Sequence, residues 1–144
     1  MAEKTIDIAS PILSRNERLA DQLRQRFNET NTYVINVLSS PGSGKTTTIL
    51  GTNERLRDKA GLRCAVIEGD IASDVDAITM KEAGMPAIQI NTGGLCHLEG
   101  NMIMEAVDAF DQAVGLDNID VIFIENVGNL VCPVDFDLGE NLSI

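Results

Sequence analysis

The chain has 144 residues, 44% of them hydrophobic and 23% charged, which is enough for one soluble domain with a substantial core. The formal net charge of −11 argues against nucleic acid as a partner, because a phosphate backbone requires a basic surface. No apolar run approaches the roughly 20 residues of a membrane span, and the amino terminus carries no secretory signal, so no membrane association is expected.

The first predicted element is an amphipathic helix that begins at Ser10-Pro11, a serine cap followed by proline at the first helical position. Leu19, Leu23 and Phe27 follow at helical spacing, and arginines occupy the remaining faces. We expect this helix to pack on the sheet that follows it. An interaction arm is the alternative.

A strand predicted over residues 33–38 leads into Ser-Ser-Pro-Gly-Ser-Gly-Lys-Thr at 39–46, and a helix then runs to about residue 59. Strand, glycine-rich turn and helix are the context of a phosphate-binding P-loop, although Ser39 stands where the pattern usually has its first glycine. Lys45 is expected to reach the β- and γ-phosphates, and the Thr46 hydroxyl to ligate Mg²⁺. The predicted nucleotide-binding residues are Pro41, Gly42, Ser43, Gly44, Lys45, Thr46 and Thr47.

Apolar runs then alternate with helical segments, with strands predicted at 62–69, 87–90 and 120–124 and helices at about 73–83 and 98–114. This alternation predicts an α/β fold, the three-layer P-loop NTPase fold, with a mostly parallel sheet and helices on both faces. Loops that follow parallel strands meet at one edge, where ligands bind. The P-loop, Asp70, the Cys96-His97 loop and the segment after Glu125 are therefore expected on one face.

Two carboxylates are candidates to hold and orient the Mg²⁺ ion. Glu125 closes the most apolar strand, and Gly128 follows it at the spacing of a γ-phosphate switch. Asp70 closes the second strand. Together with Lys45 these carboxylates are the predicted catalytic groups, and which of them contacts the metal directly stays open.

A second metal site is predicted from softer ligands in the same loops: Cys96, His97 and Cys132, whose two thiolates and one imidazole suit Zn²⁺ or Ni²⁺. Three ligands leave a tetrahedral site one short, so water or a second copy of the chain would complete it. Cys64 lies inside an apolar strand and is expected to be a buried structural thiol. Three cysteines do not make a disulfide framework and indicate a reducing, cytoplasmic setting.

Four ordered motifs resemble the nickel-insertion GTPases of hydrogenase maturation: residues 39–46, 66–70, 91–98 and 122–133, with 136–140 fitting as well. The serine at position 39 is shared by members of that family. The resemblance implies a Mg²⁺-dependent GTPase that helps load nickel into the large subunit of nickel–iron hydrogenase. It also implies a small zinc-containing nickel carrier protein as a partner, and a nucleotide-linked homodimer whose interface metal site maps onto Cys96, His97 and Cys132.

Some features of that family do not occur in these 144 residues. There is no N-terminal cysteine motif or histidine-rich tract, so a separate nickel store is not expected. The guanine-reading N-K-x-D motif is also missing, and guanine preference therefore rests on the resemblance alone. Since the family's domain continues well past Glu140, the chain is expected to be one P-loop domain, with residues 1–30 packed on it as a helix and its C-terminal part missing. The 33–38 strand would then lie on an uncovered edge, making the chain marginally stable and prone to associate.

Two other functions remain open. A urease-type nickel GTPase is the nearer one, although its Cys-Pro-His motif is not matched at Cys132-Pro133-Val134. The other is a metal-binding fragment without catalysis, which would bind Ni²⁺ or Zn²⁺ without releasing phosphate.

Overall fold

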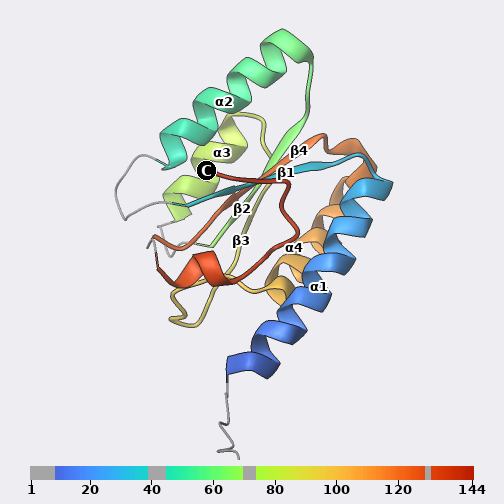
Figure 1. Ribbon diagram of the computed structural model, residues 1–144. Helices are drawn as coiled ribbons and strands as arrows, with labels where there is room; N and C mark the ends of the chain where they lie inside the picture. Colours follow the sequence, from blue (N-terminus) through green and yellow to red (C-terminus); the bar gives the residue numbers. More distant parts are fainter. Residues whose placement is uncertain (1–8, 39–44, 70–73, 129–130) are drawn as a thin grey trace, which may run out of the picture.

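Helices and strands alternate along the chain as the hydrophobic pattern predicts (Figure 1). The computed structural model describes residues 9–38, 45–69, 74–128 and 131–144. All eight elements predicted from the sequence are present, with ends that differ by a few residues. The elements are α1 (Ala9–Glu29), β1 (Tyr33–Val37), α2 (Lys45–Ala60), β2 (Cys64–Glu68), α3 (Asp74–Glu82), β3 (Ala87–Gln89), α4 (Gly100–Ala113), β4 (Val121–Glu125) and β5 (Leu142–Ser143), with short 3₁₀ helices at Leu116–Asn118 and Cys132–Asp135.

The described strands form one parallel sheet in the order β3-β2-β4-β1-β5. The register places Glu68 of β2, Glu125 of β4 and Val37 of β1 side by side, so the carboxyl ends of the central strands are level. The predicted three-layer P-loop fold is confirmed. Its ligand-binding edge is the one at which β1, β2 and β4 end.

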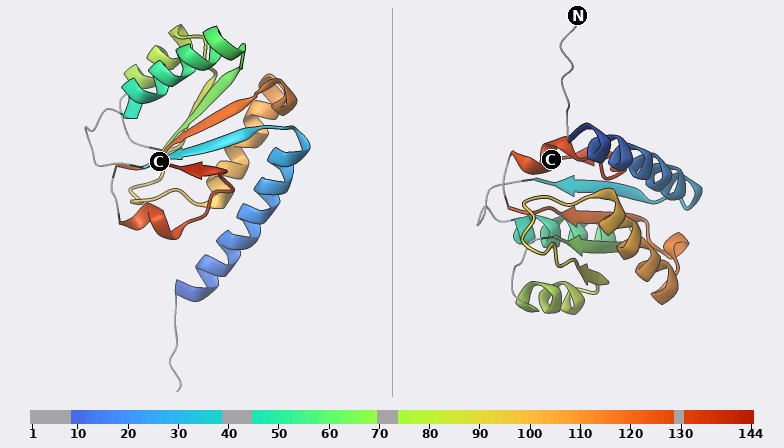
Figure 2. Two further views of the ribbon diagram at one scale, coloured as in Figure 1. Left: turned by 45° about the horizontal axis from the view of Figure 1, so that its top comes forward. Right: turned by 90° about the horizontal axis from the view of Figure 1, so that it is seen from below.

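Helices cover both faces of the sheet, with α2 and α3 on one face and α1 and α4 on the other (Figure 2). The alternation of side chains along β4 follows from this arrangement. Ile122 and Ile124 belong to the core cluster under α1 and α4, whereas Val121 and Phe123 belong to the cluster under α2. Glu125, two residues after Phe123, therefore faces the side of the sheet on which α2 begins.

The first helix packs on the sheet, as the sequence analysis expects, and is not the free interaction arm that was the alternative. Leu23 and Phe27 are at most 1% exposed in the core. The Arg24 guanidinium donates to both carboxylate oxygens of Asp137, at 2.9 and 2.8 Å. Gly139 passes this helix at a φ of 77°, and an added Cβ would lie 2.8 Å from the Cβ of Leu23. None of the described helices is both long enough and apolar enough to cross a membrane.

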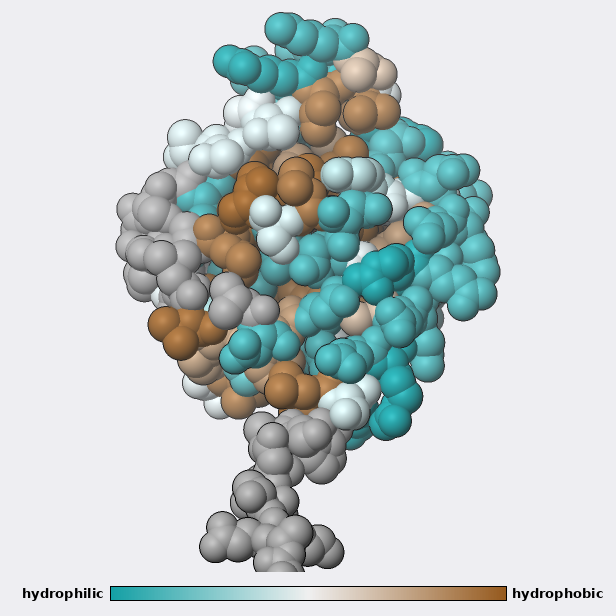
Figure 3. Space-filling model, viewed as in Figure 1, coloured by the Kyte–Doolittle hydropathy of each residue, from teal (hydrophilic) through white to brown (hydrophobic). Residues whose placement is uncertain are grey.

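The prediction of an uncovered β1 edge is wrong, because the residues after Glu140 form β5 alongside it. The Asn141 N–H donates to the Val34 carbonyl at 2.8 Å, and the Val34 N–H donates to the Asn141 side-chain oxygen at 2.8 Å. The Ile144 N–H donates to the Asn36 carbonyl at 2.9 Å. Hydrophobic residues surface near the middle of the face in Figure 3, the region where Figure 1 draws the red carboxyl-terminal segment that ends at the mark C. Leu142 of β5 and Ile144, which follows that strand, are 43% and 56% exposed.

Candidate nucleotide and metal site

The predicted site residues fall into two groups in the structure. Pro41, Gly42, Ser43, Gly44 and Asp70 lie outside the described residues. The others are described, and all belong to loops or element ends at the carboxyl edge of the sheet: Lys45, Thr46, Thr47, Cys96, His97, Glu125, Gly128 and Cys132.

The first turn of α2 meets the end of β4. Lys45 opens the helix and is 7% exposed, and Glu125 is 4% exposed. The Thr46 hydroxyl donates to the Glu125 carboxylate, at 3.2 Å from one oxygen and 3.5 Å from the other. Thr47 points to solvent on the same helix. A hydroxyl and a carboxylate in contact at a helix start offer a hard divalent cation the oxygen ligands that it prefers.

Buried amides fix the end of β4, and the sequence analysis gave them no role. The Asn126 side-chain amide donates to the Asn36 side-chain oxygen at 3.0 Å, and the Asn126 N–H donates to the Val37 carbonyl at 3.1 Å. Both asparagines are 1% exposed. A buried polar side chain needs a partner, so this pair ties the residue after Glu125 to β1. The available signal was Asn36, a polar residue inside an apolar strand.

A second buried carboxylate lies beside Glu125. Glu68 occupies the matching register position on β2 and is 2% exposed. The sequence shows Glu68 as the acidic residue at the end of an apolar strand, but the sequence analysis assigns the candidate Mg²⁺ carboxylate of this strand to Asp70. Gly69 follows, and a Cβ there would lie 2.5 Å from the Leu98 side chain, so any larger residue would force that buried leucine to move. This close packing brings the end of β2 against the start of the α4 region.

The structure brings the three predicted soft ligands together. The Cys96 Sγ lies 3.8 Å from His97 Nδ1. Hydrogen bonds with Cys132, which has the larger effect, and with His97 lower the pKa of the Cys96 thiol. The same contact with Cys96 raises the pKa of Cys132. Cys64 is separate: it is buried in β2, as predicted, and burial raises its pKa to about 11.

Contact between these side chains is not yet a closed metal site. Across the described residues, no group of three or more His, Cys, Asp or Glu side chains is arranged to hold a metal ion within one chain. The chemistry of the donor set, two thiols and one imidazole, still suits a soft or borderline ion such as Ni²⁺ or Zn²⁺.

His97 has two further neighbours that the sequence analysis did not identify. Its Nε2 lies 3.0 Å from Glu99 Oε1, and its ring stacks on Phe136 with centroids 3.9 Å apart and planes within 7°. Burial lowers the pKa of His97, but hydrogen bonds with Cys96 and Glu99 outweigh it and raise the pKa overall. Glu99 is two residues away in sequence, whereas Phe136 reaches the ring only through the fold.

The helix after β1 opens with a Lys-Thr pair, and its threonine contacts a buried carboxylate at the end of the adjacent parallel strand. This combination defines a nucleotide-binding domain of the P-loop class. Residues 33–139 match the profile of the family described as CobW/HypB/UreG, nucleotide-binding domain. The chain belongs to this family.

Curated relatives give the same result. The chain is 47% identical over 137 residues to the hydrogenase maturation factor HypB of Escherichia coli (strain K12), covering 95% of this chain and 45% of that protein. It is 43% identical over 142 residues to the hydrogenase/urease maturation factor HypB of Helicobacter hepaticus, covering 99% of this chain and 57% of that one. The chain thus spans about half the length of the curated relatives that it matches.

Two solved structures share the fold at similar identity. HypB from Helicobacter pylori in complex with nickel superposes with a TM-score of 0.80 at 40% identity, covering 90% of this chain and 58% of that one. HypB from Archaeoglobus fulgidus gives a TM-score of 0.79 at 38% identity, covering 90% and 60%.

Proposed function

We propose that this chain binds GTP with Mg²⁺ and belongs to a nickel-handling GTPase of hydrogenase maturation. The contact between the Thr46 hydroxyl and the Glu125 carboxylate carries this proposal. It joins a hydroxyl in the first turn of α2 to a buried carboxylate at the carboxyl edge of the sheet, where a P-loop protein holds Mg²⁺ and the phosphates. The names of the relatives support the biological setting, and the nickel complex of the Helicobacter pylori protein supports the metal.

Each residue at the nucleotide end has a separate task. Lys45 places a positive charge against the β- and γ-phosphates as charge develops on them during hydrolysis. Thr46 would supply a hydroxyl ligand to Mg²⁺, and Glu125 and Asp70 are the carboxylates that would hold and orient the ion. Gly128, three residues beyond Glu125, is the group that would sense the γ-phosphate.

The cargo site is proposed at Cys96, His97 and Cys132, with Ni²⁺ or Zn²⁺ as the ion. Their contact at the same edge as Thr46 and Glu125 supports this. Because one chain does not enclose an ion with its described residues, a second copy across a two-fold axis is proposed to complete the site. The expected partners are the hydrogenase large subunit and a small zinc-containing nickel carrier protein.

Mg²⁺-dependent binding of a fluorescent GTP analogue tests the nucleotide assignment. Thr46→Ala should weaken binding in the presence of Mg²⁺ by about tenfold or more, since the variant loses a metal ligand. Thr52→Ala on the same helix is the matched control, because the Thr52 hydroxyl bonds only the Thr48 carbonyl of its own helix. Equal affinities for Thr46→Ala and the wild type would overturn the assignment.

Turnover separates the remaining alternatives. The proposed GTPase releases phosphate from GTP above background, whereas a non-catalytic metal-binding fragment does not. The Helicobacter hepaticus relative is named for both hydrogenase and urease maturation, so a urease-type nickel GTPase is the second candidate. Nickel transfer to each apo-enzyme would distinguish the two recipients.

A further inference from the structure

The two nitrogens of the His97 ring face chemically different partners. Nε2 lies 3.0 Å from the Glu99 carboxylate, and Nδ1 lies 3.8 Å from the Cys96 Sγ. An ionised carboxylate only accepts hydrogen bonds, so the Nε2 of a neutral ring must carry the proton. The lone pair of the ring is then on Nδ1, on the side of Cys96.

The separation of Cys96 Sγ and His97 Nδ1 suits two ligands of one ion. A tetrahedral ion bound to sulfur at ~2.3 Å and to nitrogen at ~2.0 Å places these two atoms roughly 3.5 Å apart. The observed 3.8 Å needs only a small adjustment to reach that geometry. The adjacent residues Cys96 and His97 are thus arranged as a ligand pair before any ion arrives.

The orientation of the His97 ring is also fixed from the side. Phe136 stacks on it almost in parallel, with centroids 3.9 Å apart. Phe136 directly follows the 3₁₀ helix Cys132–Asp135, so the segment that carries the third proposed ligand also carries the stacking ring. The His97 side chain is 14% exposed. Turning the ring out of this plane would break the hydrogen bond to Glu99 and the stack together.

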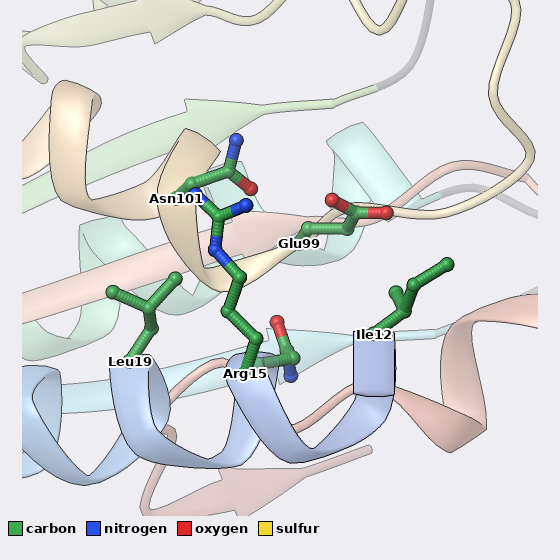
Figure 4. Close-up of a pocket in the computed structure, with 6 residues that line it drawn as sticks. Ile12, Arg15, Leu19, Glu99 and Asn101 are labelled. Carbon is green, nitrogen blue, oxygen red and sulfur yellow. The ribbon is translucent and has the colours of Figure 1, made fainter. Parts of the chain in front are cut away.

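Glu99 is itself held in place. It is the N-cap residue of α4, and its carbonyl accepts the Met102 N–H at 3.0 Å. Asn16 of α1 accepts the N–H of the next residue, Gly100, at 2.6 Å. Figure 4 shows Glu99 at a pocket of about 200 Å³ between α1 and α4, its carboxylate extending away from Arg15. A carboxylate on an anchored helix start is a rigid partner for the imidazole.

We propose that Glu99 and Phe136 are positioning residues for the proposed metal site, and that His97 binds its ion through Nδ1. Glu99 holds the ring in the Nε2–H tautomer, and Phe136 holds its plane. A carboxylate that hydrogen-bonds the second nitrogen of a metal-ligating histidine also makes that ligand more basic. This inference rests on the proposed metal-handling function.

The test uses the single histidine of the chain, because its ring signals need no assignment. Long-range ¹H–¹⁵N spectra of the apo-protein, at a pH where the ring is neutral, should show one tautomer protonated at Nε2 in the wild type. Glu99→Ala should give a mixture of tautomers, and Glu99→Gln should keep the wild-type tautomer, because its amide oxygen still accepts the bond. Titration with Zn²⁺ should move the Nδ1 resonance and leave Nε2 protonated.

Zinc affinity supplies the second measurement. Loss of such an outer partner costs about 10- to 100-fold in affinity, so Glu99→Ala should bind Zn²⁺ that much more weakly. Glu99→Gln should recover part of the loss, and Phe136→Leu should fall between Glu99→Ala and the wild type. Glu105→Ala, on the exposed face of α4, is the matched control and should bind as the wild type does. Amide spectra of each variant show whether the fold is kept.

The outcomes separate this inference from the proposed function. Zinc bound at Nε2, or wild-type affinity in a folded Glu99→Ala variant, would overturn the inference while leaving the metal site standing. A wild-type chain that binds neither Zn²⁺ nor Ni²⁺ would overturn the proposed metal function and this inference with it.

Discussion

At the amino-terminal edge of the sheet, ionisable side chains pair with one another and join neighbouring strands. At the carboxyl-terminal edge they lie beside the predicted metal-binding and nucleotide-binding residues. The amino-terminal edge is represented by Arg63 and Asp120. Arg63 donates to Asp120 from both its backbone N–H, at 2.7 Å, and its guanidinium, at 3.1 Å. Asp120 in turn donates its N–H to the Arg63 carbonyl. These bonds join the residue before β2 to the residue before β4.

The carboxyl-terminal edge differs in burial. Lys45, Glu68 and Glu125 are all less than 8% exposed there, although burying a charge is costly unless it is compensated. Perturbed and buried ionisable groups concentrate at functional sites, because function requires them where stability alone would not. The burial of these three charged side chains therefore supports the proposal that this edge carries the functional site.

The largest expected contrast between the edges is in thiol reactivity. Cys64 begins β2 at the amino-terminal edge, buried and with its pKa raised to about 11, so only about 0.1% of it is thiolate at pH 8. Cys96 is exposed and its pKa is lowered by Cys132 and His97. Iodoacetamide should alkylate Cys96 roughly 100- to 1000-fold faster than Cys64, as followed by peptide mass spectrometry. Comparable rates at the two thiols would contradict the contrast.

Lysines at opposite ends of α2 give the next contrast. Lys45 is buried at the phosphate edge, whereas Lys59 is exposed at the other end of the helix. Lys45→Ala removes the charge opposite the β- and γ-phosphates and should weaken triphosphate binding by about 100-fold or more. Lys59→Ala should change it less than twofold. Titration with a fluorescent GTP analogue measures both, and unchanged affinity in Lys45→Ala would refute the P-loop assignment.

The sequence predicts the elements of this sheet well because burial dominates their composition. β2 and β4 are buried at every position, and continuous apolar runs of that length are typical of parallel strands. β5 could not be predicted in this way, because Asn-Leu-Ser-Ile has no apolar run. Its pairing depends on the Asn141 bonds to Val34, which connect residues 107 apart in the chain.

The site was only partly predictable for a related reason. The contact of Thr46 with Glu125 follows from strand ends meeting at one edge, which the alternation of elements predicts. The stack of Phe136 on His97 depends on how the segment after Cys132 folds back, and no local pattern encodes it. The Asn16 bond to the start of α4 is a long-range contact of the same kind.

The expected coupling between the proposed nucleotide site and the proposed metal site is smaller than the two contrasts above. Cys132 lies seven residues after Glu125, and Asn126 ties the first residue of that segment to β1. Zinc affinity should therefore differ by about fivefold or more between GDP and a non-hydrolysable GTP analogue, and linkage requires the reciprocal effect on nucleotide affinity. Cys64→Ala should keep the difference. Identical zinc isotherms in the two nucleotide states would show that the sites are independent.

The smallest expected effect is at the amino-terminal edge and concerns stability alone. The hydrogen bond from Arg63 lowers the pKa of Asp120, so its contribution to stability is present above the unfolded pKa of about 3.9. That contribution is lost as the pH falls through the lower folded value. Because the pair is largely exposed, Asp120→Asn should lower the melting temperature by only a few degrees at pH 7. The difference should shrink as the pH falls below the unfolded pKa of about 3.9. At pH 7 the GTP and zinc affinities of the variant should equal those of the wild type. Asp117→Asn is the control and should shift the melting temperature less than Asp120→Asn, because the Arg63 guanidinium hydrogen-bonds only the backbone carbonyl of Asp117. A loss of GTP binding in Asp120→Asn would mean that the division between the two edges does not hold.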